Sequence, residues 1–310
     1  SSIKKSNILM IGPTGCGKTH LVKTLAKILD LPLVISPATA LTEAGYMGED
    51  VENLVVKLLD VAGGNVNKAE RGIIFIDEID KLAAISTDKT RQVGGVGVQQ
   101  ALLPLLEGTK IKIPLDRSDI KGHGAKIEID TTNILFICAG AFPEIDTIIK
   151  NRISQKRTIG FSSEVNDKCE LEEHNLILHV KNEDLREFGL IPEFLGRLPI
   201  VVPLEYMTVD ILKKILNEPK DSIISQYKKL FSYDSIQLMF EEDALEEIAI
   251  KAFDKGTGAR SLQSITENLL LDLMFELPSN TNIKEVHITK AFVEGLDMPY
   301  LLNCDKMAVN

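Results

Sequence analysis

Residues 12–19 read GPTGCGKT, and this segment constrains the fold more than any other part of the chain. It has the G-x4-G-K-T form of a phosphate-binding loop, follows an apolar run at 7–11 and precedes a helical pattern at 21–29. A strand, a glycine-rich turn and a helix in this order surround an anion with backbone N–H groups and the positive end of a helix. The alternative is a glycine-rich turn with a chance lysine, which the flanking strand and helix disfavour.

We predict that the whole loop contacts a nucleotide. Lys18 is placed to reach the β- and γ-phosphates, and Thr19 is placed to bind Mg²⁺. Cys16 is expected to contribute its backbone alone, as an inert small residue rather than a redox group. The predicted nucleotide-binding residues of the loop are Gly12, Pro13, Thr14, Gly15, Cys16, Gly17, Lys18 and Thr19.

A second motif, IIFIDE at 73–78, is an apolar run that ends in two acids. Buried acids are costly unless they are paired or bind a cation. Beside the phosphate loop, Asp77 would hold Mg²⁺ through water and Glu78 would orient and deprotonate an attacking water. A pair of exposed acids after a strand is the alternative. A glutamate directly after the aspartate favours hydrolysis over transfer to a kinase substrate.

Short apolar runs alternate with helical patterns up to about residue 205, which predicts an α/β domain with a parallel sheet covered on both faces. The runs are 7–11, 33–36, 73–77, 133–138 and 200–202. Residues 86–97 and 108–130 show little periodicity, and we expect two long loops there. After Pro203 helical patterns dominate, with short strands expected at 236–240 and 285–288. We predict an ATP-binding domain over 1–204, a smaller, mostly helical α+β domain over 205–310, and a hinge at 203–208.

Composition excludes several classes of protein. With 44% hydrophobic and 26% charged residues, the chain has ample material for a core and does not resemble a disordered protein. The net charge of −10 argues against nucleic acid as a main partner. The four cysteines have no zinc-site spacing, and we expect a reducing compartment. No apolar run is long enough to span a bilayer, and the first residues do not form a signal peptide.

Seven segments taken together resemble the bacterial ClpX family of unfoldases, which are AAA+ ATPases. In chain order they are GPTGCGKT, EAGYMGEDVE, IIFIDEIDKL, GVQQALL, ILFICAGAF, GLIPEFLGRLP and KGTGARSLQSI. The resemblance runs from about residue 6 to about residue 300. It implies ATP and Mg²⁺ as cofactors, ADP as product, a homohexameric ring, and threading of unfolded or tagged proteins into a ClpP-type peptidase. It also implies a bacterial cytoplasmic location, with the mitochondrial matrix as the alternative, and no nucleic-acid or membrane partner.

The resemblance assigns roles to residues that spacing alone leaves open. Arg197 matches the arginine finger that acts on a neighbouring subunit, and Arg260 matches the sensor-II arginine; from spacing alone, both read more simply as surface ion pairs. Tyr46 and Met47 match the pore loop that grips substrate, the alternative being a plain loop before a helix. The peptidase-docking loop matches Ile159, Gly160 and Phe161, the alternative being a short buried strand.

Three positions depart from the family pattern. The 114–130 loop lacks the Arg-Lys-His triplet that is usual there, and Val96 stands where an acid is usual in the second pore loop. Pro104 falls inside a helical pattern, where we expect a lost hydrogen bond and a kink. The family's N-terminal zinc-binding domain is not expected in this chain, because its four cysteines cannot build one.

Other functions remain open at this point. A remodelling chaperone that works without a peptidase would share every motif except the docking loop. A nucleic-acid motor of the AAA+ class is disfavoured by the acidic balance and the aromatic pore loop. A nucleotide kinase is disfavoured by the IDE sequence and the second domain.

Overall fold

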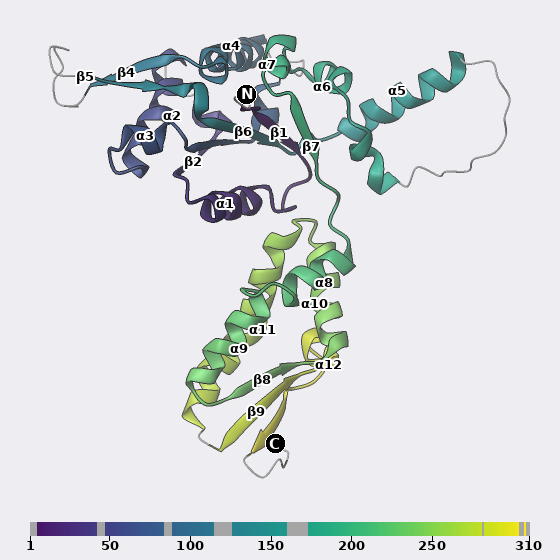
Figure 1. Cartoon of the computed structure of the whole chain (residues 1–310). Coiled ribbons are helices and arrows are strands. Elements are labelled where there is room, and N and C mark those ends of the chain that lie inside the picture. The colour runs from purple at the N-terminus through teal and green to yellow at the C-terminus, as the bar shows by residue number, and fades with distance from the viewer. Residues whose placement is uncertain are drawn as a thin grey trace. The chain divides into compact units, whose positions relative to one another are not determined.

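The computed structural model describes residues 5–41, 47–83, 89–114, 126–159, 173–280, 282–303 and 307. The chain forms two compact units, one of residues 1–13 with 17–206 and the other of residues 207–310 with 14–16 (Figure 1). Each unit has a hydrophobic core of its own. We call the first the large unit and the second the small unit.

A parallel sheet forms the centre of the large unit, as the sequence predicts. Its strand order is β2-β3-β6-β1-β7, and every neighbouring pair in this order is parallel. The strands are β1 (Ile8–Ile11), β2 (Leu33–Pro37), β3 (Ile73–Asp77), β6 (Leu135–Gly140) and β7 (Ile200–Pro203). The strand that leads into the phosphate loop and the strand that leads into the two acids are separated only by β6, so their carboxyl ends lie at one edge of the sheet.

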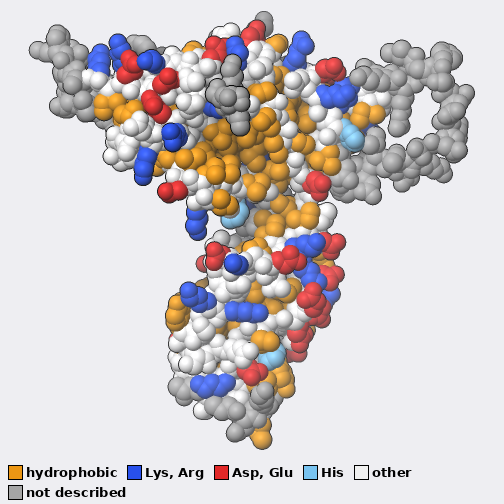
Figure 2. All heavy atoms as spheres, in the orientation of Figure 1, with side chains coloured by type: hydrophobic (Ala, Val, Ile, Leu, Met, Phe, Trp, Pro, Cys, Tyr) orange, Lys and Arg blue, Asp and Glu red, His pale blue; other side chains and the backbone are white. Residues whose placement is uncertain are grey.

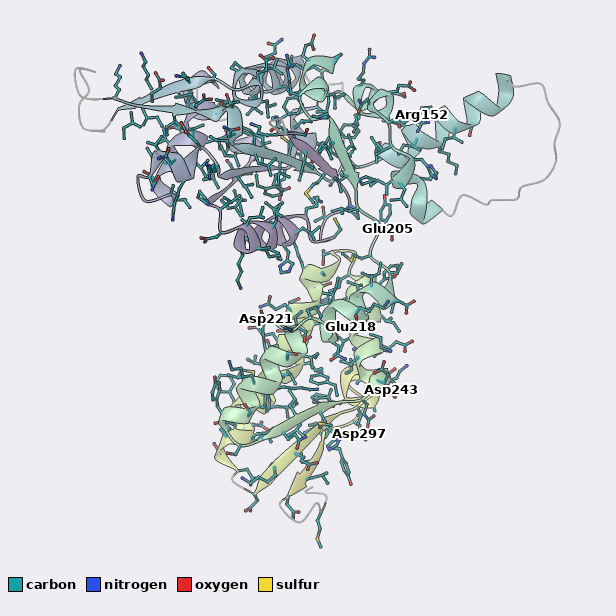
Figure 3. The ribbon with its side chains drawn as sticks, in the orientation of Figure 1. Arg152, Glu205, Glu218, Asp221, Asp243 and Asp297 are labelled. Carbon is teal, nitrogen blue, oxygen red and sulfur yellow. The ribbon has the colours of Figure 1, made fainter. Side chains whose placement is uncertain are left out.

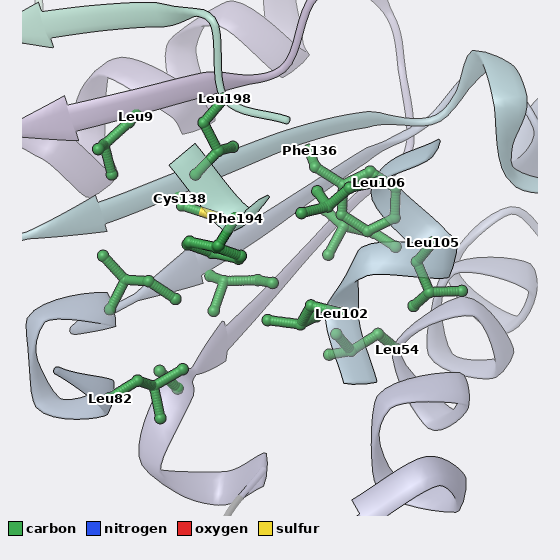
Figure 4. Packing of buried hydrophobic residues seen from close by; sticks show 14 of the residues in the cluster. Leu9, Leu54, Leu82, Leu102, Leu105, Leu106, Phe136, Cys138, Phe194 and Leu198 are labelled. Atoms are coloured by element: carbon green, nitrogen blue, oxygen red, sulfur yellow. The ribbon is translucent and has the colours of Figure 1, made fainter. Parts of the chain in front are cut away.

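Helices cover both faces of this sheet (Figure 1). Alternate strand residues point to opposite sides: Ile74 and Ile76 join the core under α2, α4 and α7, whereas Ile73 and Phe75 pack with α1. Figure 4 shows part of the first of these cores, which includes Leu54, Leu102, Phe136 and Phe194. The helices of the large unit are α1 (Lys18–Leu29), α2 (Met47–Val61), α3 (Val66–Ala69), α4 (Lys89–Glu107), α5 (Ile145–Ile159), α6 (Asn182–Phe188) and α7 (Pro192–Gly196). Short 3₁₀ turns are η1 (Ala38–Leu41), η2 (Ile79–Leu82), η3 (Thr131–Asn133) and η4 (Glu173–His179).

The α1 helix buries a different stripe from the one its leucines indicate. Val22 and Ala26 are buried against the sheet, whereas Leu21, Ile28 and Leu29 are 48%, 75% and 50% exposed. Hydrophobic side chains gather on one face of the large unit in Figure 2. The helix itself is as the sequence predicts.

Two expected loops contain regular structure in the parts that the structure describes. Residues 89–97 belong to α4, so that part of the expected 86–97 loop is wrong. Within 108–130, β4 (Lys110–Pro114) and β5 (Lys126–Asp130) pair as an antiparallel hairpin. Both strands alternate apolar and charged residues, KIKIP and KIEID, which is the period of a half-exposed strand.

Pro104 lies inside α4, and the helix is assigned without interruption on both sides of it. Its ring and the side chain of Gln100 are exposed, on the solvent side of the helix. The hydrogen bond is lost as expected, because proline has no N–H, while the expected kink stays a prediction. The helix tolerates the loss because a missing hydrogen bond on the solvent face leaves a carbonyl that water can reach.

The small unit is mostly helical around a short sheet of order β10-β9-β8. The β8–β9 pair is parallel and the β9–β10 pair is antiparallel. The predicted strands near 236–240 and 285–288 are confirmed as β8 (Gln237–Phe240) and β9 (Ile283–Ile288), and β10 (Tyr300–Asn303) was not expected. Its helices are α8 (Val209–Asn217), α9 (Ile223–Tyr233), α10 (Glu242–Asp254), α11 (Ala259–Glu276) and α12 (Lys290–Glu294), with a 3₁₀ turn η5 (Leu277–Ser279). Among the described residues, no helix of the chain is long and apolar enough to cross a membrane.

Candidate nucleotide site

The phosphate loop turns tightly between β1 and α1. Gly15 and Gly17 have φ values of 81° and 91°, a left-handed conformation that side-chain-bearing residues adopt only at a cost. Gly17 is also the N-cap of α1, so the helix begins at Lys18 with its free N–H groups directed toward the loop. The sequence therefore uses glycine at the two positions where the backbone must curl around a ligand.

Lys18 is held against the start of the loop. Its ammonium donates to the carbonyl oxygens of Gly12 and Pro13, at 2.6 Å and 3.0 Å, and the residue is only 8% exposed. A buried ammonium with these partners is oriented before any ligand arrives. This geometry fits a residue that binds phosphate oxygens at the mouth of the loop.

Thr19 and Asp77 come together across the top of the sheet. The Thr19 hydroxyl donates to Oδ2 of Asp77 at 3.2 Å, although the two residues are 58 positions apart in the sequence. A hydroxyl and a carboxylate are oxygen ligands of the kind that Mg²⁺ prefers when it also binds a nucleotide phosphate. The residue pair that the sequence predicts for the metal is therefore assembled, and its chemistry fits a Mg²⁺–nucleotide complex.

Glu78 follows with a strained backbone. Its φ of 58° lies in the left-handed region, where a residue other than glycine costs about 1 kcal/mol or more. Its N–H donates to Oδ1 of Asp77 at 2.9 Å, which helps to hold this conformation, and the residue is exposed. Strain of this kind at the end of a strand is typical of functional sites, and an exposed carboxylate here is open to a water molecule.

Asp80, which sequence reasoning did not select, fixes the segment that follows. It is 6% exposed, and its Oδ1 accepts from the N–H of Ala141 at 3.2 Å. Gly140 makes room for this contact, since a Cβ there would lie 2.6 Å from the same oxygen. The third acid of IDEID is the signal that could have identified Asp80, because a carboxylate two residues after the acid pair is costly to bury without a partner.

Arg197 is the C-cap residue of α7 and is half exposed. Its guanidinium pairs with Glu107 at 2.5 Å rather than with the phosphate loop. Asn7, 5% exposed, donates from Nδ2 to the carbonyl of Arg197 at 3.1 Å and so fixes the backbone from which this side chain extends.

Arg260 is the second residue of α11 in the small unit, and its side chain is exposed. The start of this helix is held by Ser261, whose hydroxyl donates to the carbonyl oxygens of Gly258 and Ala252 at 2.8 Å and 3.1 Å. The backbone from which Arg260 extends is therefore well defined.

Several predicted residues lie outside the described part of the chain. Tyr46 is one of them, and Met47 is described only as the first residue of α2. Gly160 and Phe161 are also outside it, and Ile159 is described only as the last residue of α5. The roles predicted for these five residues stay predictions.

A parallel sheet in this strand order, with a phosphate loop after β1 and an acid pair after β3, defines the nucleotide-binding domain of an AAA ATPase. The family model described as "AAA domain (Cdc48 subfamily)" matches residues 3–201, and the one described as "C-terminal, D2-small domain, of ClpB protein" matches residues 207–291. The chain is thus an AAA+ ATPase.

Two curated relatives narrow the class. "ATP-dependent Clp protease ATP-binding subunit ClpX 3" of Methylococcus capsulatus is 46% identical over 298 residues, covering 94% of this chain and 68% of the relative. "ATP-dependent Clp protease ATP-binding subunit ClpX" of Treponema denticola is 50% identical over 293 residues, covering 94% and 70%. The chain belongs to the ClpX family.

Proposed function

We propose that this chain, assembled in a ring of six identical subunits, hydrolyses ATP to unfold proteins and pass them to a ClpP-type peptidase. The observation that carries the ATP-driven part is the pairing of Thr19 with Asp77, next to Lys18 and Glu78. Family membership supports the unfolding and peptidase part, because both relatives are named as subunits of a Clp protease. Their bacterial sources favour a cytoplasmic location.

The residues of the loop would bind the nucleotide with distinct roles. The N–H groups at the start of α1 and the Lys18 ammonium would hold its phosphates, and Thr19 with Asp77 would hold the Mg²⁺. Bound Mg²⁺–ATP supplies the transferable phosphoryl group and neutralises part of its charge. Glu78 accepts the proton of the water that it orients, at the exposed end of β3.

The arginines would complete the site. Arg197 would reach the nucleotide of a neighbouring subunit, where it stabilises negative charge on the transferred phosphoryl group. Arg260 would sense the nucleotide of its own subunit from the small domain, which we place at 205–310. Tyr46 and Met47 would press on the polypeptide substrate in the pore, and Ile159, Gly160 and Phe161 would dock on the peptidase.

The decisive experiment is ATP-dependent degradation of a stable, tagged protein with and without a ClpP-type peptidase. Glu78→Gln should retain nucleotide binding while ATP hydrolysis falls by about 10²-fold or more, since a positioned general base contributes about that factor. Glu52→Gln, an exposed acid on α2, is the control and should hydrolyse ATP at the wild-type rate. A Glu78→Gln variant that hydrolyses ATP normally would overturn the assignment.

Two further variants distinguish substrate unfolding from ATP hydrolysis alone and from delivery to the peptidase. Tyr46→Ala should spare ATP hydrolysis and abolish unfolding of the stable substrate. Phe161→Ala should spare unfolding and abolish degradation by the peptidase. If Phe161→Ala changes nothing and no peptidase is captured by the wild-type chain, the chain is a remodelling chaperone that works alone.

A further inference from the structure

Gln99 is a fully buried amide on α4 whose two ends bind two different elements. Its Nε2 donates to the carbonyl oxygen of Leu82, and its Oε1 accepts from the N–H of Ile191, both at 2.8 Å. The donor and acceptor identities of the two partners determine which way the amide points. Neither contact belongs to a helix or a sheet, so this one side chain joins segments 17 and 92 residues away in the sequence.

The Leu82 end of this connection leads directly to the acid pair. Leu82 closes η2, the turn that begins after Glu78, and the N–H of Lys81 donates back to the Glu78 carbonyl at 3.0 Å. α4 also packs closely here, because a Cβ on Gly95 would lie 2.6 Å from the Leu82 carbonyl oxygen. A shift of the backbone at Glu78 is therefore passed to the oxygen that Gln99 binds.

The Ile191 end leads to Arg197. Ile191 is the N-cap of α7, and this helix is a connection of only five residues that ends at Gly196. The N–H of Leu195 donates to the Ile191 carbonyl and that of Arg197 to the Phe194 carbonyl, at 3.1 Å and 3.0 Å. Displacing Ile191 therefore displaces the residue that carries the guanidinium.

A second buried amide holds the other end of the same helix. Asn7 donates to the carbonyl oxygens of Leu106 and Arg197, both at 3.1 Å, and accepts from the N–H of Phe136 at 3.3 Å. α7 is thus held to α4 at both ends. Packing alone would be satisfied by leucine or methionine at position 99, and a buried amide is costly unless both of its ends are bonded.

We propose that Gln99 is a positioning residue that couples the nucleotide-contacting segment after β3 to the helix that presents Arg197. The proposal rests on the proposed function. Through Gln99, the nucleotide bound in one subunit would alter the position of Arg197, the residue that acts on the nucleotide of the neighbouring subunit.

The test compares Gln99→Met, which keeps the volume and loses both hydrogen bonds, with Gln100→Met. Gln100 is the adjacent residue on α4 and is exposed, so its variant is a matched control. The measurement is hydrogen exchange of the 190–198 segment in the full chain, with and without Mg²⁺–ADP, alongside direct titration with a fluorescent ADP analogue. Wild type and Gln100→Met should show an ADP-dependent change in this segment.

Gln99→Met should bind the analogue within about twofold of wild type and show no ADP-dependent change at 190–198, with exchange there about tenfold faster in both states. In ATP hydrolysis it should lower kcat while KM changes by less than about twofold. Persistence of the ADP-dependent change in Gln99→Met would overturn the proposal, and so would its absence from wild type that binds ADP. A wild-type chain that binds ADP but never unfolds protein would contradict the proposed function instead. The hydrogen-exchange comparison would still decide whether Gln99 couples the two segments.

A second variant guards against a folding defect in Gln99→Met. Ile191→Pro removes the N–H that Gln99 accepts from and leaves the amide itself in place. The φ of Ile191 is −73°, which a proline ring adopts without strain. The ADP-dependent change at 193–198 should be lost in this variant as well, and its retention would contradict the coupling.

Discussion

The guanidinium of Arg197 lies 2.5 Å from Oε1 of Glu107, the last residue of α4, and these side chains are 50% and 46% exposed. An ion pair this exposed contributes at most about 1 kcal/mol to stability. Under the proposed function Arg197 must leave this carboxylate to reach a neighbouring nucleotide. The pair therefore restrains the arginine only weakly.

Glu107→Gln should increase ATP hydrolysis by assembled rings about two- to fivefold, because an exposed pair worth less than about 1 kcal/mol no longer competes for Arg197. The free energy of unfolding should change by less than about 1 kcal/mol. Steady-state ATPase assays and urea unfolding measure the two effects. Glu193→Gln, an exposed acid on α7, is the control. A clear fall in kcat would mean that Glu107 positions the arginine rather than restraining it.

Thr19→Val should weaken Mg²⁺-dependent nucleotide binding by about tenfold or more, since valine keeps the shape and removes the hydroxyl that faces Asp77. Thr19→Ser should keep most of the affinity. Titration with a fluorescent ADP analogue, in Mg²⁺ and then in EDTA, isolates the metal-dependent part. Thr24→Val, an exposed threonine on the same helix, should behave as wild type. Equal losses in Mg²⁺ and EDTA would remove Thr19 from the metal site.

Arg152 and Asp184 form the most buried ion pair described in the large unit, with side chains only 12% and 1% exposed. Arg152, labelled on α5 in Figure 3, donates from Nε and Nη2 to the two carboxylate oxygens at 2.6 Å and 3.0 Å. The hydrogen bond to the Asp184 carboxylate raises the pKa of Arg152 above its ordinary value, so the guanidinium keeps its charge. Asp184 also accepts from the N–H of Lys181 at the start of α6.

Arg152→Met should lower the free energy of unfolding by about 3–5 kcal/mol, because it leaves a buried carboxylate without its cation. Adding Asp184→Asn should recover part of that loss, since an amide oxygen still accepts from Lys181. Urea unfolding of the single and double variants gives the comparison. The free energy of unfolding of Arg152→Lys should lie between that of Arg152→Met and that of wild type, because an ammonium cannot bind both carboxylate oxygens in the same plane. A double variant less stable than Arg152→Met would contradict the argument.

Burial raises the pKa of the Cys138 thiol to about 12. The folded state therefore keeps this proton, while an unfolded chain releases it near a pKa of about 8.5. Between these values the unfolded state binds fewer protons, so this residue lowers stability as pH rises through that window and has no effect below it. Iodoacetamide labelling at pH 8.5, mapped by mass spectrometry, should modify Cys138 only after denaturation. Rapid native labelling would show that β6 opens readily.

The strands of the large unit were predictable because strands buried on both faces read as continuous apolar runs. β3 was predicted with its observed bounds, 73–77, and β1 and β2 within one residue. The phosphate-loop conformation followed from its glycines for the same local reason. The hairpin of β4 and β5 was missed, although its alternating residues carry the signal, because the apolar content of each strand is low.

Polar contacts between residues far apart in the chain could not be predicted from the sequence. Nothing local in QQALL distinguishes Gln99, which binds two distant backbone groups, from exposed Gln100. The exposure of Leu21, Ile28 and Leu29 on α1 could not be predicted either, because hydrophobic spacing defines a helix face without showing whether another element covers it. Such features depend on how the elements pack, and each element's own sequence does not encode them.

Pro104→Ala should stabilise the large unit by about 1–2 kcal/mol. Alanine restores the N–H that can bond to the Gln100 carbonyl and removes the clash of the ring with it, a gain of about 3 kcal/mol in a helix interior. Two effects reduce this gain. Alanine frees the unfolded chain from proline's restriction, which offsets about 0.4–1 kcal/mol. Pro104 also lies on an exposed face, where water already solvates the Gln100 carbonyl. The urea midpoint should rise with an unchanged m value. Pro143→Ala, at an exposed turn position, should instead lower the free energy of unfolding by up to about 1 kcal/mol. A drop in stability for Pro104→Ala would mean that the native path of α4 depends on the proline.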